Sequence, residues 1–80
     1  MKLVMQTKAA KQLSKLPKKD AEAILVKLNR FCDNDRVGLD VTKLVGADML
    51  RLRHGQWRAL FTDEGDLIEV VRVAHRLEVY

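Results

Sequence analysis

The sequence predicts an α+β fold of the order β-α-α-β-β-β, in which two N-terminal helices pack on a small, mostly antiparallel sheet. Two patterns support this prediction. Apolar residues recur at helical spacing from residue 9 to residue 31, and they alternate with polar residues from residue 49 onwards. Turns that contain glycine divide the second region into segments of strand length. The 80 residues suffice for one domain with a thin core, which we expect to span residues 1–80.

The first half of the chain is expected to hold a strand and two helices. Residues 2–6 form a short strand that pairs with a later one. Thr7 has the side chain of a helix N-cap, and the first helix covers Lys8–Leu16. Pro17 interrupts it and starts the second helix, because proline is tolerated in a first turn but not in a helix interior. That helix has one apolar stripe, formed by Ala21, Ile24, Leu25, Leu28 and Phe31.

The second half is expected to be a sheet of three strands. The elements in chain order are a loop at 33–40, a short connector at 41–45, strands at 49–53, 57–62 and 67–73, and turns at 54–56 and 63–66. Asp63–Asp66 is typical of a hairpin turn. Leu67–Val73 is β-branched and almost continuously apolar, which predicts a central strand covered on both faces.

Composition excludes several classes of protein. With 48% hydrophobic and 32% charged residues the chain is typical of a globular protein rather than a disordered one. No apolar run approaches the ~18 residues of a membrane span, and residues 1–16 lack a signal-peptide core, so we expect a cytoplasmic protein without membrane contact. Cys32 is the only cysteine, and with two distant histidines it gives no zinc spacing. We therefore expect no disulfide, metal or cofactor.

Charge is distributed unevenly around the net value of +4. Residues 1–30 carry eight bases and two acids, whereas residues 49–80 carry five of each, and all five bases there are arginines. Lysine on a helix is usually a solvated face, but arginine on a strand suits bidentate contact with phosphate or carboxylate. A basic surface of this kind indicates nucleic acid or an acidic protein as a partner.

Three arginines are expected to share one sheet face. Arg51 and Arg53 are two residues apart on one strand, and a turn at Gly55 places Arg58 across from them. Two interpretations remain open. The arginines form salt bridges with the nearby acids Asp63, Glu69 and Glu78, or they bind an anionic ligand.

Most enzyme templates do not fit. The sequence has no nucleophile elbow, no phosphate-binding glycine loop and no cluster of acids that suits metal-dependent hydrolysis. Metal-free RNA cleavage through the 2′-hydroxyl remains, because it needs only positioning, charge stabilisation and proton transfer. Arginines would supply the charge, while His54, His75 or Tyr80 would assist with protons.

Three linked motifs resemble the RelE/ParE toxin superfamily. They are Lys43-Leu44-Val45-Gly46, the hairpin segment Arg51-Leu52-Arg53-His54-Gly55-Gln56-Trp57-Arg58, and the ending Val73-Ala74-His75-Arg76-Leu77-Glu78-Val79-Tyr80. The resemblance implies a RelE-like fold and a toxin of a type II toxin–antitoxin system. RelE-like toxins cleave mRNA on the ribosome without a metal, whereas ParE-like toxins poison DNA gyrase, and a cognate antitoxin protein inhibits both. We favour the RelE-like branch; the alternatives are a gyrase poison and a decayed member that only binds its antitoxin.

The resemblance also implies roles for particular residues. Catalytic roles fall to Arg51, Arg58, His75, Arg76 and Tyr80, and RNA contacts to Lys43, Arg53 and His54. Arg58 would stabilise the scissile phosphate, Tyr80 would stack on the substrate base or assist proton transfer, and the lysine-rich helices would contact ribosomal RNA. Met49 and Ala74 stand where many nuclease members have cations, which leaves the general base open between His75 and His54.

Overall fold

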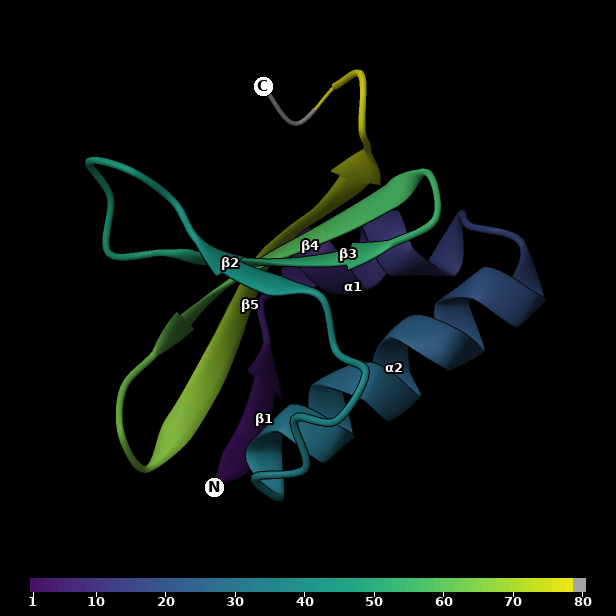
Figure 1. Cartoon of the computed structure of the whole chain (residues 1–80). Coiled ribbons are helices and arrows are strands. Elements are labelled where there is room, and N and C mark those ends of the chain that lie inside the picture. The colour runs from purple at the N-terminus through teal and green to yellow at the C-terminus, as the bar shows by residue number, and fades with distance from the viewer. Residues whose placement is uncertain (79–80) are drawn as a thin grey trace.

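The computed structural model describes residues 1–78 as two helices packed on a five-stranded mixed sheet (Figure 1). The elements are β1 Lys2–Met5, α1 Thr7–Ser14, α2 Lys18–Cys32, β2 Val41–Lys43, β3 Leu50–His54, β4 Trp57–Asp63 and β5 Leu67–His75. The sheet order is β1-β5-β4-β3-β2, with β1 parallel to β5 and the other pairs antiparallel. The predicted α+β fold is confirmed, as is the pairing of the first strand with a later one.

The segment predicted to be a connector contains a further strand. Val41–Lys43 forms β2, which pairs antiparallel with β3 and places Val41 across from Leu52. The prediction missed it because three residues are too short to show a period of two. The sheet therefore has one more strand on its β3 side than the sequence indicated.

The start of α1 also differs from the prediction. The Gln6 carbonyl accepts the first helical hydrogen bond, from the Ala10 N–H at 2.9 Å, so Thr7 is the first helical residue and not the cap. Pro17 does stand at the start of α2, as predicted. None of the helices within residues 1–78 is long and apolar enough to cross a membrane.

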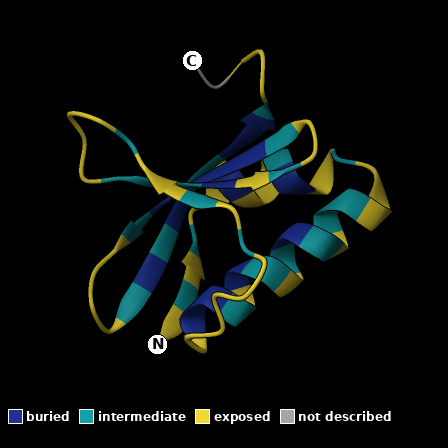
Figure 2. Cartoon of the chain, in the orientation of Figure 1, coloured by how far each residue is buried: buried dark blue, intermediate teal, exposed yellow. Residues whose placement is uncertain are grey.

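The core lies between the helices and one face of the sheet. Figure 2 shows buried positions gathered along β4, β5 and the inner side of α2. The largest fully buried side chains are those of Phe31, Phe61, Ile24, Leu28, Leu52, Ile68, Val70 and Val73. The rings of Phe31 and Phe61 meet edge to face with centroids 5.0 Å apart, which joins α2 to β4.

The central position of β5 is confirmed, but its predicted burial on both faces is wrong. Ile68 and Val70 are fully buried, whereas Leu67 and Glu69, which alternate with them along the strand, are half-buried, because the helices cover only one face. β1 pairs only with the first half of β5, which leaves the edge of the second half open. There the Gln12 side chain of α1 accepts a hydrogen bond from the Val73 N–H at 2.8 Å.

Candidate functional site

An open pocket of about 320 Å³ lies where the β3–β4 turn meets the chain that leaves β5. We call it the arginine pocket. Its lining contains three arginines and no acid: Arg53, Gly55, Gln56, Arg58 and Arg76. Arg53 and Arg58 are direct cross-strand partners at the end of the hairpin, so they share the sheet face opposite the helices. A small concave surface with this lining suits an anionic ligand.

Arg58 is the buried member of the pocket. The residue is only 7% exposed, and its Nη1 donates hydrogen bonds to the Gly55 carbonyl at 2.8 Å and the Trp57 carbonyl at 2.9 Å. Its Nε is buried without a hydrogen-bond partner among the described residues. No ion pair joins Arg58 to a carboxylate of residues 1–78. A buried cation is stabilised by an opposite charge, so the pocket favours an anion beside this guanidinium.

The other two arginines, Arg76 and Arg53, are exposed, and each contacts a side chain outside the hairpin carbonyls that bind Arg58. Arg76 Nε donates to the Gln56 side-chain carbonyl at 2.7 Å, and its backbone N–H donates to the Gln56 backbone carbonyl at 2.7 Å. These two bonds tie the chain after β5 to the β3–β4 turn. Arg53 Nε lies 3.9 Å from Asp40 Oδ2, with more than half of each side chain exposed, so this ion pair is weak. Sequence reasoning considered other acids as arginine partners and missed both Gln56 and Asp40.

Two further predicted residues lie outside the pocket lining. Arg51 is half-buried on the same face as Arg53, and it stands across from Thr42 on one side and Leu60 on the other. Lys43 pairs with Leu50 at the opposite end of β3 and lines a separate hollow formed by residues 43–48. The structure therefore places Arg51 beside the pocket and Lys43 well away from it.

The two histidines lie on the helix-covered side of the sheet. His54 Nδ1 is 2.8 Å from Lys27 Nζ, and His54 Nε2 is 3.3 Å from Asp20 Oδ1. His75 is the cross-strand partner of Trp57, with the ring centroids 5.4 Å apart in an edge-to-face contact. Cross-strand partners share a face and neighbours along a strand alternate, so both histidines face away from Arg58. His75, which was predicted to act together with the arginines, therefore lies on the opposite face from Arg58.

The C-terminal segment is held by a further arginine. Arg72 on β5 donates from Nη2 to the Glu78 carbonyl at 2.7 Å. The Glu78 N–H in turn donates to the His75 carbonyl at 2.9 Å, which closes a turn after β5. Tyr80 lies outside the described residues. Sequence reasoning missed this role of Arg72, because a backbone carbonyl partner leaves no trace in a pattern of side chains.

The described residues hold one cysteine, Cys32, and several side chains of the types that bind metal ions. Cys32 is buried, and burial raises the pKa of its thiol, which disfavours the nucleophilic thiolate at neutral pH. Within residues 1–78, no three His, Cys, Asp or Glu side chains are placed to hold a metal ion together. The arrangement that remains can bind an anion and stabilise negative charge that develops on it.

Several solved structures with this fold are toxins or toxin–antitoxin complexes. A chain of the RelB–RelE antitoxin–toxin complex from Methanococcus jannaschii is 26% identical with a TM-score of 0.81, over 96% of this chain and 94% of that one. A chain of the intact RelBE complex from E. coli is 25% identical with a TM-score of 0.73, over 92% and 94%. The isolated E. coli RelE toxin shares the fold at 22% identity, with a TM-score of 0.74 over 92% and 82%. The fold is thus that of a RelE-like toxin.

A match to a family model shows the family to which the chain belongs. The chain belongs to the family described as the ParE toxin of type II toxin–antitoxin system, parDE, whose model matches residues 3–80. A comparison with curated proteins finds no significant match. The predicted membership of the RelE/ParE superfamily is confirmed, and the protein is a toxin of a type II toxin–antitoxin system.

Proposed function

We propose that this toxin is a ribosome-dependent mRNA endonuclease that cleaves through the RNA 2′-hydroxyl without a metal ion. The observation that carries the proposal is the arginine pocket, and above all the buried guanidinium of Arg58, which has no carboxylate partner in residues 1–78. A phosphodiester suits such a pocket, because a planar guanidinium can donate two parallel hydrogen bonds to phosphate oxygens. The structural likeness to RelE toxins supports the same branch.

The proposed reaction is an internal displacement at phosphorus. The 2′-oxygen attacks the adjacent phosphorus and the bond to the 5′-oxygen breaks, which leaves a 2′,3′-cyclic phosphate and a 5′-hydroxyl. Arg58 would stabilise the negative charge that grows on the phosphoryl oxygens, and Arg76 and Arg53 would hold the flanking backbone. Since both histidines face away from the pocket, Tyr80 remains the chain's candidate for proton transfer or base stacking.

A second basic surface suits the ribosome. Lys8 and Lys11 on α1 and Lys15 at its C-cap follow one another at spacings of three and four. All three are exposed and form no ion pair with an acid of residues 1–78. We call them the lysine ridge. In this proposal the ridge contacts ribosomal RNA, where each neutralised phosphate adds about −0.7 to −0.9 to the salt slope of log K. Action on translating ribosomes implies that the protein works in the cytoplasm.

The proposed inhibitor is an antitoxin protein. The structures from Methanococcus jannaschii and E. coli are toxin–antitoxin complexes, and the present chain offers basic surfaces on both its sheet and its helices. An acidic and apolar segment of the antitoxin would cover the arginine pocket or the lysine ridge. If that charge attraction contributes, the affinity of the purified pair falls as salt rises; an affinity independent of salt would indicate a mainly apolar interface.

Primer extension on a reporter mRNA in a translating extract tests the nuclease. We expect cuts within codons that require ribosomes, with 2′,3′-cyclic phosphate ends. The protein with Tyr80→Phe serves as a comparison, because it keeps the ring for stacking and removes the hydroxyl. Intact mRNA in the presence of well-folded protein would contradict the proposal.

Poisoning of DNA gyrase is the second candidate, and two observations favour it. The matching family model is that of ParE toxins, and neither described histidine faces the arginine pocket to assist with protons. This function would need a binding surface but no chemistry at the pocket. Inhibited supercoiling by purified gyrase, together with intact mRNA in the extract, would establish it in place of the nuclease.

A further inference from the structure

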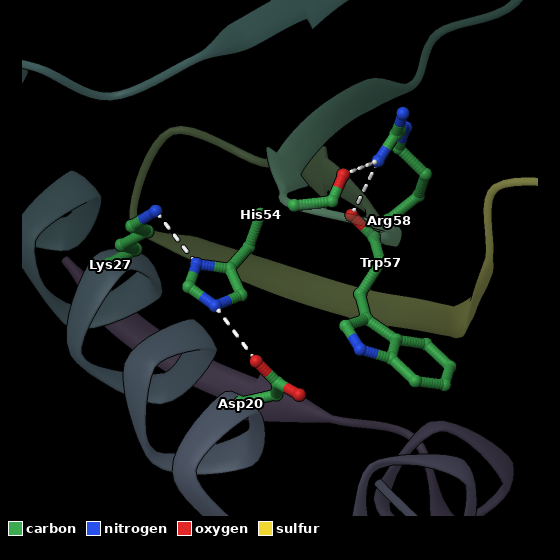
Figure 3. Close-up of polar contacts among 6 residues, drawn as sticks. Asp20, Lys27, His54, Trp57 and Arg58 are labelled. Atoms are coloured by element: carbon green, nitrogen blue, oxygen red, sulfur yellow. Dashed lines mark hydrogen bonds and ion pairs between the residues drawn. The ribbon is translucent and has the colours of Figure 1, made fainter. Parts of the chain in front are cut away.

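His54 bridges the β3–β4 hairpin and α2 through two charged side chains. Its Nδ1 lies 2.8 Å from Lys27 Nζ, and its Nε2 lies 3.3 Å from Asp20 Oδ1 (Figure 3). Asp20 and Lys27 are seven residues apart, so they stand two turns apart on one side of α2. The His54 side chain is 23% exposed and that of Asp20 33%, so both contacts are partly shielded from water.

The chemistry of the three groups fixes where the protons lie. A lysine ammonium only donates hydrogen bonds, so His54 Nδ1 must accept one, and a carboxylate only accepts, so Nε2 must carry the hydrogen. The arrangement therefore selects the neutral imidazole with its proton on Nε2. The other neutral tautomer would point an N–H at the Lys27 ammonium and leave Nε2 with nothing to donate to Asp20.

His54 is also next along the chain to the residue whose carbonyl holds Arg58. His54 is the last residue of β3, and the carbonyl of the next residue, Gly55, accepts the bond from Arg58 Nη1 at 2.8 Å. Gly55 has a positive φ of 55°, which glycine tolerates and most residues do not. In Figure 3 the His54 side chain points toward α2, while Arg58 extends from the other side of the strand pair. The turn between them thus joins a contact with α2 to the guanidinium in the pocket.

We infer that Asp20, His54 and Lys27 form a positioning relay that docks the β3–β4 turn on α2 and so fixes the guanidinium of Arg58 in the arginine pocket. The sequence suggested His54 as a group for proton transfer or an RNA contact, and its neighbours give it this different role. His54 is a positioning residue, since it acts through the turn. The consequence for RNA cleavage rests on the proposed function, but the positioning of Arg58 does not.

Two His54 variants separate positioning from mere packing. His54→Leu introduces an apolar side chain of similar size and removes both contacts, whereas His54→Gln keeps an acceptor for Lys27 and a donor for Asp20. Nitrogen-15 NMR reports the exchange of the Arg58 Nε–H, which is buried in the intact protein. We expect His54→Leu to speed this exchange about tenfold or more, and His54→Gln to stay within about threefold of the original protein.

A matched pair of α2 variants covers the case in which His54→Leu fails to fold. Asp20→Ala and Glu22→Ala each remove one carboxylate from α2, but only Asp20 faces His54, since Glu22 pairs with Lys18 in solvent. Asp20→Ala should speed Arg58 Nε–H exchange and Glu22→Ala should not. The imidazole nitrogen shifts should show the proton on Nε2. Equal exchange in all variants, or a proton on Nδ1, would overturn the inference.

Cleavage assays then connect the relay to function. If the proposed nuclease activity is present, His54→Leu should lower kcat about tenfold or more with little change in KM, because substrate affinity comes mainly from the other cationic side chains. A loss confined to KM would contradict positioning and favour direct RNA contact by His54. If the unaltered protein cleaves no RNA, the proposed function fails while the exchange measurement still decides the positioning.

Discussion

The arginine pocket and the lysine ridge both carry positive charge, yet they are built in opposite ways. In the pocket, Arg58 is 7% exposed and bound to two backbone carbonyls of the same hairpin. On the ridge, Lys8, Lys11 and the C-cap residue Lys15 are exposed along α1 and its end, with no ion pair to an acid of residues 1–78. A fixed guanidinium can recognise one phosphate in one orientation, whereas flexible ammonium groups attract any polyanion. The pocket is therefore suited to stabilising charge on one phosphate, and the ridge to binding RNA without regard to orientation.

The largest effect is expected from Arg58→Lys, which keeps the charge of the pocket but removes the planar fork. A lysine has a single nitrogen at its tip, so it cannot both satisfy the Gly55 and Trp57 carbonyls and face a phosphate. We expect single-turnover cleavage on the ribosome to fall about 10²–10³-fold, the usual effect of removing one donor that stabilises a transition state.

Arg30→Lys is the matched control for Arg58→Lys. Arg30 bonds Asp35 and the Val37 carbonyl in the loop after α2, and none of these residues lines the pocket, so cleavage should stay unchanged. If Arg58→Lys cleaved as well as the original protein, the pocket would act through charge alone. Its fixed guanidinium would then offer nothing that the flexible lysines of the ridge lack.

A smaller effect is expected when the lysine ridge is neutralised. Replacing Lys8, Lys11 and Lys15 together by glutamine should weaken ribosome binding about 10–100-fold near 0.1 M salt and reduce the salt slope of log K by about 2–3. The rate of cleavage in the bound complex should not change. Binding measured across a salt series, followed by single-turnover cleavage at saturation, checks both points.

Replacing the same three lysines by arginine provides the control for the ridge. This variant keeps the charge and should keep the salt slope. A glutamine variant that lost catalytic rate but kept its salt slope would show that the ridge positions the substrate. That result would contradict the proposal that the ridge serves only to bind the ribosome.

The sequence predicted the shared face of the arginines better than it predicted the residues that contact them. The alternation of Arg51 and Arg53 with leucines, and the turn at Gly55, correctly placed Arg53 and Arg58 together on one face. Strand β2 was missed because three residues show no period, and its partner choice depends on the rest of the sheet. Contacts of Arg76 with Gln56 and of His54 with α2 join segments 20 and 34 residues apart, which no local pattern encodes.

The two histidines illustrate the same limit. Sequence reasoning treated His54 and His75 as candidates for proton transfer because imidazole suits that role. In the fold each occupies the strand position that faces the helices, where His54 meets Asp20 and His75 meets Trp57. The alternation that puts Arg51 and Arg53 on one face already puts His54 on the other. For His75 the side depended on the register shift between β4 and β5 at Leu60/Phe61, which the sequence did not show.

Arg53→Ala should have a still smaller effect than the ridge variant. Arg53 lines the pocket but is exposed, and within residues 1–78 its one acidic partner, Asp40, lies 3.9 Å away. Losing one phosphate contact should weaken RNA binding about fivefold near 0.1 M salt and reduce the salt slope by about 0.7–0.9. A loss of catalytic rate as large as that of Arg58→Lys would contradict the proposed roles, in which the exposed Arg53 only binds RNA and the buried Arg58 stabilises the transition state.

The smallest effect is expected at Arg30 and Asp35, where an arginine serves structure alone. The Arg30 hydrogen bond holds the pKa of Asp35 below its usual range. The stabilisation is therefore complete above the unfolded pKa of about 3.9 and is lost as the pH falls through the lower folded value. Asp35→Asn should lower Tm by about 1–4 °C at pH 7 and pH 5, and the difference should shrink toward pH 3. A difference that persisted in acid would assign the effect to packing of the loop instead of to the ion pair, and the arginines of this protein would then differ less in role than their surroundings indicate.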